Sequence, residues 1–376
     1  MLGLGFNDEQ RELRNAVRTF LGRRSDEERV RAIMGSPSGL DDDTWRGLAE
    51  LGCHGLTVSD ERHGAGATLV EQGVVFEELG RSLACVPYFA TIGLALDLLH
   101  ACEREGLSPD VAALAGDAIT RIADGDLMAT VAVAEPDHGW DLNDLSTAAT
   151  AGPDGWRLSG TKAYVPEGHL AGLLLVVARH RTEVVVLAVD PASDGVRVTQ
   201  VPVMDQTRRQ ARIEFDEASA TLLVRDGDEL VRRSLQRASA LLAVEQVGVA
   251  QRMLDGTLEY VKVREQFGRP VGSFQAVKHR LADVLMDVEG ARSAAYYAVV
   301  AAHEDGEEMV EATSLAKAYC SDALVRTANA TIQLHGGIGL TWEHWAHLCL
   351  KRARSSAVLL GTAQQHRERL AVAIGI

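Results

Sequence analysis

The spacing of apolar residues changes near residue 126, and this change limits the folds that the chain can adopt. Between residues 126 and 225 the sequence consists of short apolar runs of strand length, separated by turn residues, such as 173–178, 183–189 and 196–201. The segments on either side show a helical spacing of apolar residues instead. We therefore predict an α+β chain, mostly α, with three domains. These are a helical domain in residues 1–125, a β domain in 126–225 and a helical bundle in 226–376.

The predicted helices have recognisable start and stop signals. Asn7 precedes the acidic residues Asp8 and Glu9, a pattern typical of a helix N-terminus. The sequence Pro-Ser-Gly at residues 37–39 interrupts the helical spacing. Residues 229–263 contain no proline, so a single long helix is expected there.

Charge and cysteine usage narrow the class of protein. The chain has 376 residues and a net charge of −15 at pH 7. Nucleic acids and anionic membranes attract basic proteins, so we expect neither of them as a partner of this acidic chain. Five cysteines are scattered without a Cys-x-x-Cys pair, which argues against a disulfide framework and a zinc site. No apolar run is long enough to span a bilayer, and the N-terminus turns acidic too early for a secretory signal. We expect a cytoplasmic protein.

Three short motifs follow one another in the last third of the chain. Residues 260–275 read YVKVREQFGRPVGSFQ, residues 333–341 read QLHGGIGLT and residues 361–364 read GTAQ. Arg264 at a helix end is suited to a diphosphate, because its planar donors match phosphate oxygens, and Phe267 is suited to pack on a flat ring. Gly336 and Gly337 allow a ligand to approach the backbone closely. Each motif alone also fits a structural interpretation, namely a surface arginine, a core phenylalanine and a helix C-cap.

Together, in this order and at this spacing, the motifs resemble the flavin-binding signature of the acyl-CoA dehydrogenase family. The resemblance runs along essentially the whole chain and implies the fold of that family: an N-terminal helical domain, a middle β-barrel or sandwich domain and a C-terminal four-helix bundle. It implies FAD as the cofactor, in sites built between neighbouring subunits. The FAD contacts that it implies in these motifs are Arg264, Gln266, Phe267, Phe274, Gln275, Gln333, Gly336, Gly337, Thr362 and Gln364.

The β domain matches the family less closely where the flavin ring is expected. Residues 133–136, VAEP, resemble the family's Thr-Glu-Pro loop, with Ala134 in place of the threonine that touches the ring. Residues 160–165, GTKAYV, resemble a strand whose aromatic residue borders the ring, and that residue is Tyr164 here. Pro166 stands where this strand carries a threonine in the family. The resemblance therefore implies ring contacts at Val133, Ala134 and Tyr164, in an altered setting.

The reaction of this family needs a carboxylate that removes an α-proton, in a dry site that raises its pKa. The two positions where family members carry that acid are occupied by Leu360, before the Gly-Thr motif, and by Ala238, on the predicted long helix. Glu245 lies two turns after Ala238 in an apolar run and is the candidate catalytic base. The alternative is a structural Glu245 that pairs with Arg252. Arg237, Ala238 and Leu360 are the candidate substrate contacts.

These interpretations favour FAD-dependent α,β-dehydrogenation of an acyl-CoA thioester, in fatty acid or steroid side-chain catabolism. With no acid before the Gly-Thr motif, the chain resembles one of the paired subunits that form heterotetrameric dehydrogenases in actinobacteria. We therefore expect a homo- or heterotetramer, with an electron-transfer flavoprotein as electron acceptor. Two alternatives stay open: a non-catalytic partner subunit that completes a flavin site in a homologous chain, and a flavin oxidase or monooxygenase on the same fold.

Overall fold

The computed structural model describes residues 5–153 and 155–376 and divides the chain into two compact units. The helical unit contains the described residues up to 32, together with 68–84 and 239–376. The sheet unit contains the described residues of 33–67 and 85–238. The three domain boundaries expected from the sequence stay predictions.

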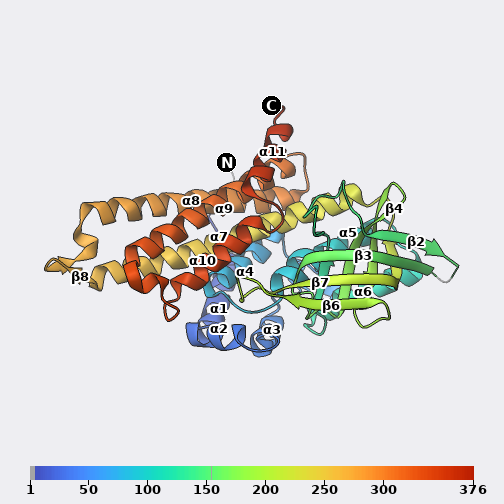
Figure 1. Ribbon diagram of the computed structural model, residues 1–376, viewed down its shortest axis with the longest axis horizontal. Coiled ribbons are helices and arrows are strands. Elements are labelled where there is room, and N and C mark those ends of the chain that lie inside the picture. The colour runs from blue at the N-terminus through green and yellow to red at the C-terminus, as the bar shows by residue number, and fades with distance from the viewer. Residues whose placement is uncertain (1–4, 154) are drawn as a thin grey trace. The chain divides into compact units, whose positions relative to one another are not determined.

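The helical unit is built around long helices, of which α8 and α9 run side by side (Figure 1). A two-stranded hairpin, β8 (Glu265–Gln266) and β9 (Arg269–Pro270), lies at one end of α8. Its helices are α1 (Asp8–Arg24), α4 (Leu69–Ser82), η3 (Val271–Ser273), α8 (Gln275–Glu304), α9 (Met309–His335), η4 (Gly336–Leu340), α10 (Ala346–Val358) and α11 (Ala363–Ala373). Two further helices, α2 (Glu27–Met34) and α7 (Asp228–Val263), cross the boundary between the units in sequence. The long helix expected over 229–263 is therefore confirmed.

Side-chain caps explain where two of these helices begin. The Asn7 side chain accepts a hydrogen bond from the Gln10 backbone amide at 2.8 Å, and the Asn7 backbone amide donates to the Gln10 side-chain oxygen at 3.1 Å, which forms a capping box. Thr68 and Glu71 form the same box at the start of α4. The Gln10 side chain also donates to Glu71 at 2.7 Å, so the two caps are linked. The helix start expected at Asn7 is confirmed.

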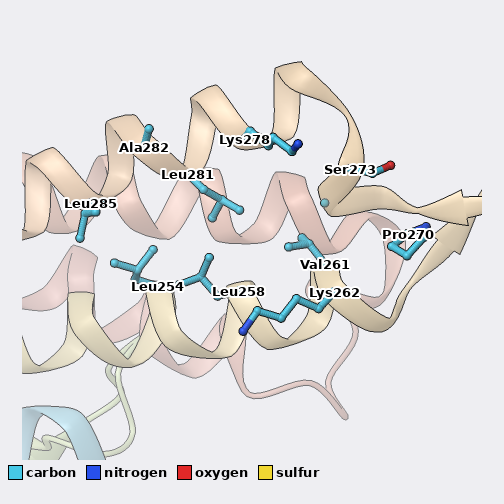
Figure 2. A pocket seen from close by; sticks show the side chains of 11 residues that line it. Leu254, Leu258, Val261, Lys262, Pro270, Ser273, Lys278, Leu281, Ala282 and Leu285 are labelled. Carbon is cyan, nitrogen blue, oxygen red and sulfur yellow. The ribbon is translucent and has the colours of Figure 1, made fainter.

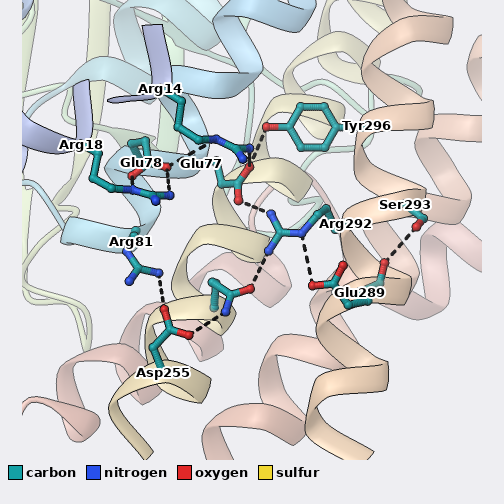
Figure 3. A network of polar contacts seen from close by, with 11 residues as sticks. Arg14, Arg18, Glu77, Glu78, Arg81, Asp255, Glu289, Arg292, Ser293 and Tyr296 are labelled. Atoms are coloured by element: carbon teal, nitrogen blue, oxygen red, sulfur yellow. Dashed lines mark hydrogen bonds and ion pairs between the residues drawn. The ribbon is translucent and has the colours of Figure 1, made fainter. Parts of the chain in front are cut away.

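A buried network of charged residues holds α1, α4 and α8 together within the helical unit (Figure 3). The Glu77 carboxylate accepts from Arg14 at 2.8 Å and from the Tyr296 hydroxyl at 2.7 Å, and it also pairs with Arg292. The neighbouring Glu78 binds the Arg18 guanidinium through two hydrogen bonds. Glu77 and Glu78 are almost fully buried, so these partners are needed to offset the loss of hydration.

The sheet unit has a sheet that closes on itself. Strand β4 pairs with β5, β5 with β7, β7 with β3, β3 with β2, and β2 with β4, which completes a circuit, while β1 and β6 join from its sides. Its strands are β1 (Ala129–Ala132), β2 (Ala148–Gly152), β3 (Gly155–Pro166), β4 (Leu173–His180), β5 (Glu183–Val189), β6 (Val196–Val201) and β7 (Gln210–Val224). Inward-facing apolar side chains such as Leu158, Val176 and Ile213 fill the enclosed core. The expected β-barrel or sandwich domain is confirmed in its barrel form.

The remaining helices of the sheet unit are α3 (Asp42–Glu50), η1 (Asp60–Arg62), η2 (Phe89–Leu96), α5 (Asp97–Arg104) and α6 (Pro109–Ala123). The sequence favours a helix over residues 90–99, and the structure places a π-helical segment, η2, in its first part. All eight residues of η2 are buried. A helix that is buried on all sides is apolar throughout, whether it is an α-helix or a π-helix, so an apolar run does not distinguish the two.

The cysteines and the apolar character of the helices can be compared with the sequence analysis. All five cysteines are buried free thiols, as expected, and burial raises the pKa of Cys53 to about 12. Among the described helices, none combines the length and the apolar character needed to cross a lipid bilayer.

Candidate functional site

The first motif forms an exposed hairpin with an aromatic tip. Strands β8 and β9 pair through Glu265–Pro270 and Gln266–Arg269, and the two loop residues, Phe267 and Gly268, have φ angles of 53° and 74°. Positive φ at both positions is the geometry of a type I′ hairpin turn. Phe267 is 92% exposed, and its ring lies edge to face against the Phe274 ring, with centroids 6.2 Å apart. A strained backbone that presents a solvated phenylalanine is typical of a contact with another molecule.

The structure brings the first and second motifs together within the helical unit. The Tyr260 ring stacks on the His335 ring with centroids 4.4 Å apart, and the Tyr260 hydroxyl donates to the His335 carbonyl at 3.3 Å. Gly336 follows at the end of α9 with φ of 65°, and neither Gly336 nor Gly337 has another atom within 4 Å of the position where a Cβ would lie. Together with the exposed Gln333, this open backbone allows a ligand to approach, as the sequence predicts.

The third motif forms a tight turn and the start of α11. Leu360 and Gly361 have φ angles of 61° and 108°, and Leu360 is buried. Thr362 caps α11: its hydroxyl accepts from the Gln365 amide at 3.3 Å. Gln364 is exposed and donates to Glu368 at 3.1 Å. The backbone amides at this end of the helix carry partial positive charge, which suits an anionic group.

An apolar pocket lies beside the hairpin, between α7 and α8 (Figure 2). Its volume is about 540 Å³. Four of the eleven lining residues are leucines, Leu254, Leu258, Leu281 and Leu285. Two lysines, Lys262 and Lys278, are the charged residues of the lining. Its walls therefore suit an apolar occupant with an anionic edge.

The sheet unit brings its three candidate contacts together at a bulge in β3. Val133 and Ala134 are buried just after β1, and the Ala163 amide donates to the Ala134 carbonyl at 2.8 Å. The register between β3 and β7 shifts between Lys162 and Val165. Within this bulge Tyr164 adopts a φ of 54° and is 50% exposed. A bulge redirects a side chain out of the strand pattern, which here leaves the tyrosine ring accessible.

A buried ion pair, which sequence reasoning missed, fixes the same corner of the sheet unit. The Lys162 ammonium donates to the Val133 carbonyl at 2.9 Å and to the Glu135 carboxylate at 2.7 Å. Glu135 also accepts from the Ser146 and Thr147 amides at 2.6 and 2.9 Å. Burial of the carboxyl acts to raise its pKa, but the Lys162 charge and these hydrogen bonds outweigh burial and lower the pKa of Glu135 to about 2. The lysine–glutamate spacing in the sequence carries no signal of this pairing.

The three positions considered for a catalytic base lie in different settings. Leu360 and Ala238 are buried and apolar. Glu245 is 2% exposed, and its carboxylate accepts from the Arg352 guanidinium of α10 at 2.9 Å. Arg252, the alternative partner considered from the sequence, donates to the Arg81 and Ser82 carbonyls. A buried carboxylate bound to a buried arginine is stabilised as an anion, which favours a structural role for Glu245.

Arg237, a candidate substrate contact, lies in the sheet unit beside Asp97 of α5. The shortest distance between its guanidinium and the Asp97 carboxylate is 3.8 Å, and the Ser234 hydroxyl donates to the same carboxylate at 2.7 Å. The Arg237 side chain is largely buried. Its role toward a substrate stays a prediction.

Comparison with known proteins identifies the family. Three family models match the chain: the acyl-CoA dehydrogenase N-terminal domain over residues 7–104, the middle domain over 130–218 and the C-terminal domain over 225–375. The acyl-CoA dehydrogenase IpdE2 of Mycobacterium tuberculosis is 35% identical over 368 residues, which cover 96% of each chain. The related IpdE2 of Mycolicibacterium smegmatis is 32% identical over 373 residues, 97% of this chain and 98% of the relative.

Solved structures agree with this assignment. A variant of the Tcur3481-Tcur3483 steroid ACAD has a TM-score of 0.88 at 31% identity, with 98% of both chains covered. The ChsE4-ChsE5 complex from Mycobacterium tuberculosis has a TM-score of 0.89 at 27% identity, with 99% of both chains covered. The fold and the family expected from the motifs are thus confirmed, and the open glycine backbone and the aromatic hairpin tip fit the flavin that this family binds. The chain belongs to the acyl-CoA dehydrogenase family of FAD-binding oxidoreductases.

Proposed function

We propose that this chain is one subunit of a heteromeric enzyme that dehydrogenates the α,β bond of an acyl-CoA thioester with FAD. The exposed Phe267 hairpin carries this proposal, because a strained aromatic tip that is 92% exposed fits a flavin site completed by a neighbouring subunit. The named complexes among the similar structures, Tcur3481-Tcur3483 and ChsE4-ChsE5, support a heteromeric assembly.

The residues of this chain would hold FAD in three places. Arg264, Gln266, Phe267, Phe274 and Gln275 would reach the diphosphate and rings of a flavin in the neighbouring subunit. Gln333, Gly336, Gly337, Thr362 and Gln364 would bind through open backbone and side-chain amides. Val133, Ala134 and Tyr164 would border the flavin ring. A bound FAD would supply the acceptor for the β-hydride of the substrate, and a carboxylate would take the α-proton, which would leave an α,β double bond.

The source of that carboxylate separates two versions of the proposal. Leu360 and Ala238 have no proton-accepting group, and Glu245 is held by Arg352. This ion pair favours the version in which a partner subunit supplies the base, while Leu360, Ala238 and Arg237 contact the substrate. In the other version the Glu245 carboxylate leaves its ion pair with Arg352, contacts the substrate and acts as the base itself.

Substitution of Glu245 by Gln distinguishes these versions. If the partner supplies the base, we expect the Glu245→Gln complex to retain turnover within about threefold, because a glutamine still accepts a hydrogen bond from Arg352. Turnover would be measured at saturating acyl-CoA on the flavin-loaded complex. A loss of turnover by a factor of about a thousand or more, with flavin still bound, would assign the base to Glu245.

The assembly is tested by counting flavin. The chain expressed alone should bind well below one FAD per protomer and reach full occupancy when a homologous partner chain is present. Absorption at the flavin maximum, divided by protein concentration, gives this ratio. One FAD per protomer in the isolated chain would show that a homotetramer builds complete sites.

The substrate class and the electron acceptor are parts of the same proposal. The steroid ACAD among the similar structures supports a bulky acyl group such as a steroid side chain. Electrons would leave through an electron-transfer flavoprotein in the cytoplasm. Anaerobic bleaching by a series of acyl-CoA esters, followed by reoxidation with that acceptor, tests both parts.

The hairpin tip gives a further prediction. Replacing Phe267 with Gly should lower flavin occupancy of the assembled enzyme by about tenfold, because an aromatic contact with the flavin is lost. The melting temperature of the chain without flavin should stay the same or rise, because glycine adopts positive φ without strain. Phe267→Tyr is the matched control and should keep its flavin. Equal occupancy in both variants would remove Phe267 from the flavin site.

A further inference from the structure

Lys317, in the first half of α9, is a lysine with no exposed surface. Its ammonium donates to the Ser321 hydroxyl at 3.0 Å, to the Gly361 carbonyl at 3.2 Å and to the Ala357 carbonyl at 3.5 Å. Lysines are almost never fully buried, because the loss of hydration must be offset by bonds to the ammonium. Two of its three acceptors belong to the end of α10 and to the turn that follows it.

The Ser321 hydroxyl is one of the three groups that accept from Lys317. It also accepts from the Gln246 side chain at 3.1 Å, so it already serves as an acceptor for a second donor. An ammonium has three protons for Ser321, Gly361 and Ala357, whereas a neutral amine has two. Burial lowers the pKa of Lys317 to about 7, because the ammonium loses its hydration.

His366 of α11 holds the other carbonyl of the same turn. Its Nε2 lies 3.1 Å from the Leu360 carbonyl oxygen, and since a carbonyl only accepts, Nε2 must carry the proton. The ring is buried, and burial lowers its pKa to about 3, so the imidazole is neutral. The carbonyls of Leu360 and Gly361, two residues with positive φ, are therefore each bound by a buried donor from another part of the helical unit.

We propose that Lys317 and His366 are positioning residues that lock the Leu360–Gly361 turn and thereby place Thr362 and the first turn of α11 at the flavin. A left-handed leucine is disfavoured on its own, so the turn requires outside partners to persist. Lys317 also lies at the negative end of the α10 dipole, where a cation is favoured. The effect on flavin rests on the proposed function, whereas the locking of the turn does not.

Hydrogen exchange and flavin release test this proposal on the full-length, FAD-loaded complex. Lys317→Met removes the donors and keeps an unbranched side chain that is one atom shorter. We expect backbone amides in residues 359–363 to exchange about tenfold faster or more, since a hydrogen bond from a charged group is lost, and FAD to dissociate about tenfold faster. Ser321→Ala is the matched control, because it removes the lysine's partner within α9 and leaves both carbonyl contacts in place. Its exchange in 359–363 should match the wild type.

A second pair of variants covers the case in which Lys317→Met fails to fold. His366→Leu removes the donor to the Leu360 carbonyl and should loosen the turn, whereas His366→Gln keeps an N–H donor and should restore it. A folded Lys317→Met or His366→Leu protein with wild-type exchange in 359–363 would overturn the proposal. Faster exchange with unchanged flavin release would support the lock and would count instead against the place of Thr362 in the flavin site.

Discussion

Replacing Gly248 with Ala should lower the free energy of unfolding of the helical unit by about 3 kcal/mol or more. A Cβ added at Gly248 of α7 would lie 1.9 Å from the Glu77 carbonyl oxygen of α4, and a Cβ at Gly80 of α4 would lie 2.1 Å from the Glu245 carbonyl oxygen of α7. The two helices thus touch backbone to backbone at a pair of glycines. Backbone atoms on both sides are fixed by helical hydrogen bonds, so neither side can make room locally.

Chemical denaturation of the variant measures this effect, and two further variants control it. Gly80→Ala should destabilise the protein similarly, because it separates the same two helices. Gly22→Ala, in α1, should be neutral or stabilising by up to about 1 kcal/mol, because nothing lies within 4 Å of its added Cβ and alanine has the higher helix propensity. If Gly248→Ala unfolded at the same denaturant concentration as Gly22→Ala, the close contact of α4 and α7 would be wrong.

This contact shows what the sequence could and could not predict. A glycine inside the long apolar helix is visible in the sequence, but its partner lies on a helix about 170 residues earlier, and no local pattern joins them. The helix itself was predictable because residues 229–263 contain no proline. The capping box at Asn7 and the strand runs were predictable for the same reason, since each depends on neighbours in sequence.

In the candidate site, too, continuous motifs were visible in the sequence and distant partners were not. The motifs that contain Phe267, the glycine pair and Thr362 are visible because each is continuous in sequence, and their roles at a flavin stay predictions. The residues that support them were missed: Lys317 lies 44 residues before the carbonyl of Gly361 that it binds, and Arg352 lies 107 residues after Glu245. Burial of a charge depends on a partner brought in by tertiary structure, so the sequence left Glu245 as either a base or a partner of Arg252 and did not show the pairing with Arg352.

The largest effect expected in the sheet unit comes from Lys162. Lys162→Met should lower the free energy of unfolding at pH 7 by about 3–5 kcal/mol, because it leaves the Glu135 carboxylate buried without its cation. Glu135→Gln combined with Lys162→Met should recover most of this loss, because the buried charge is gone. Arg225→Met is the matched control: its pair with Glu183 has a similar distance, 2.9 Å, but is exposed, so its loss should cost no more than about 1 kcal/mol.

The pH dependence of the Lys162→Met effect gives the sharper test. In the wild type the pKa of Glu135 is lowered from 4.5 to about 2, so its contribution to stability is complete above pH 4.5 and is lost as the pH falls toward 2. Without Lys162 the carboxyl takes up a proton at higher pH and becomes neutral. The difference in unfolding free energy between wild type and Lys162→Met should therefore shrink as the pH is lowered from 7 to 3. A difference that stays constant over this range would show that the lysine acts through packing alone, and that the Val133–Glu135 corner is not held by charge.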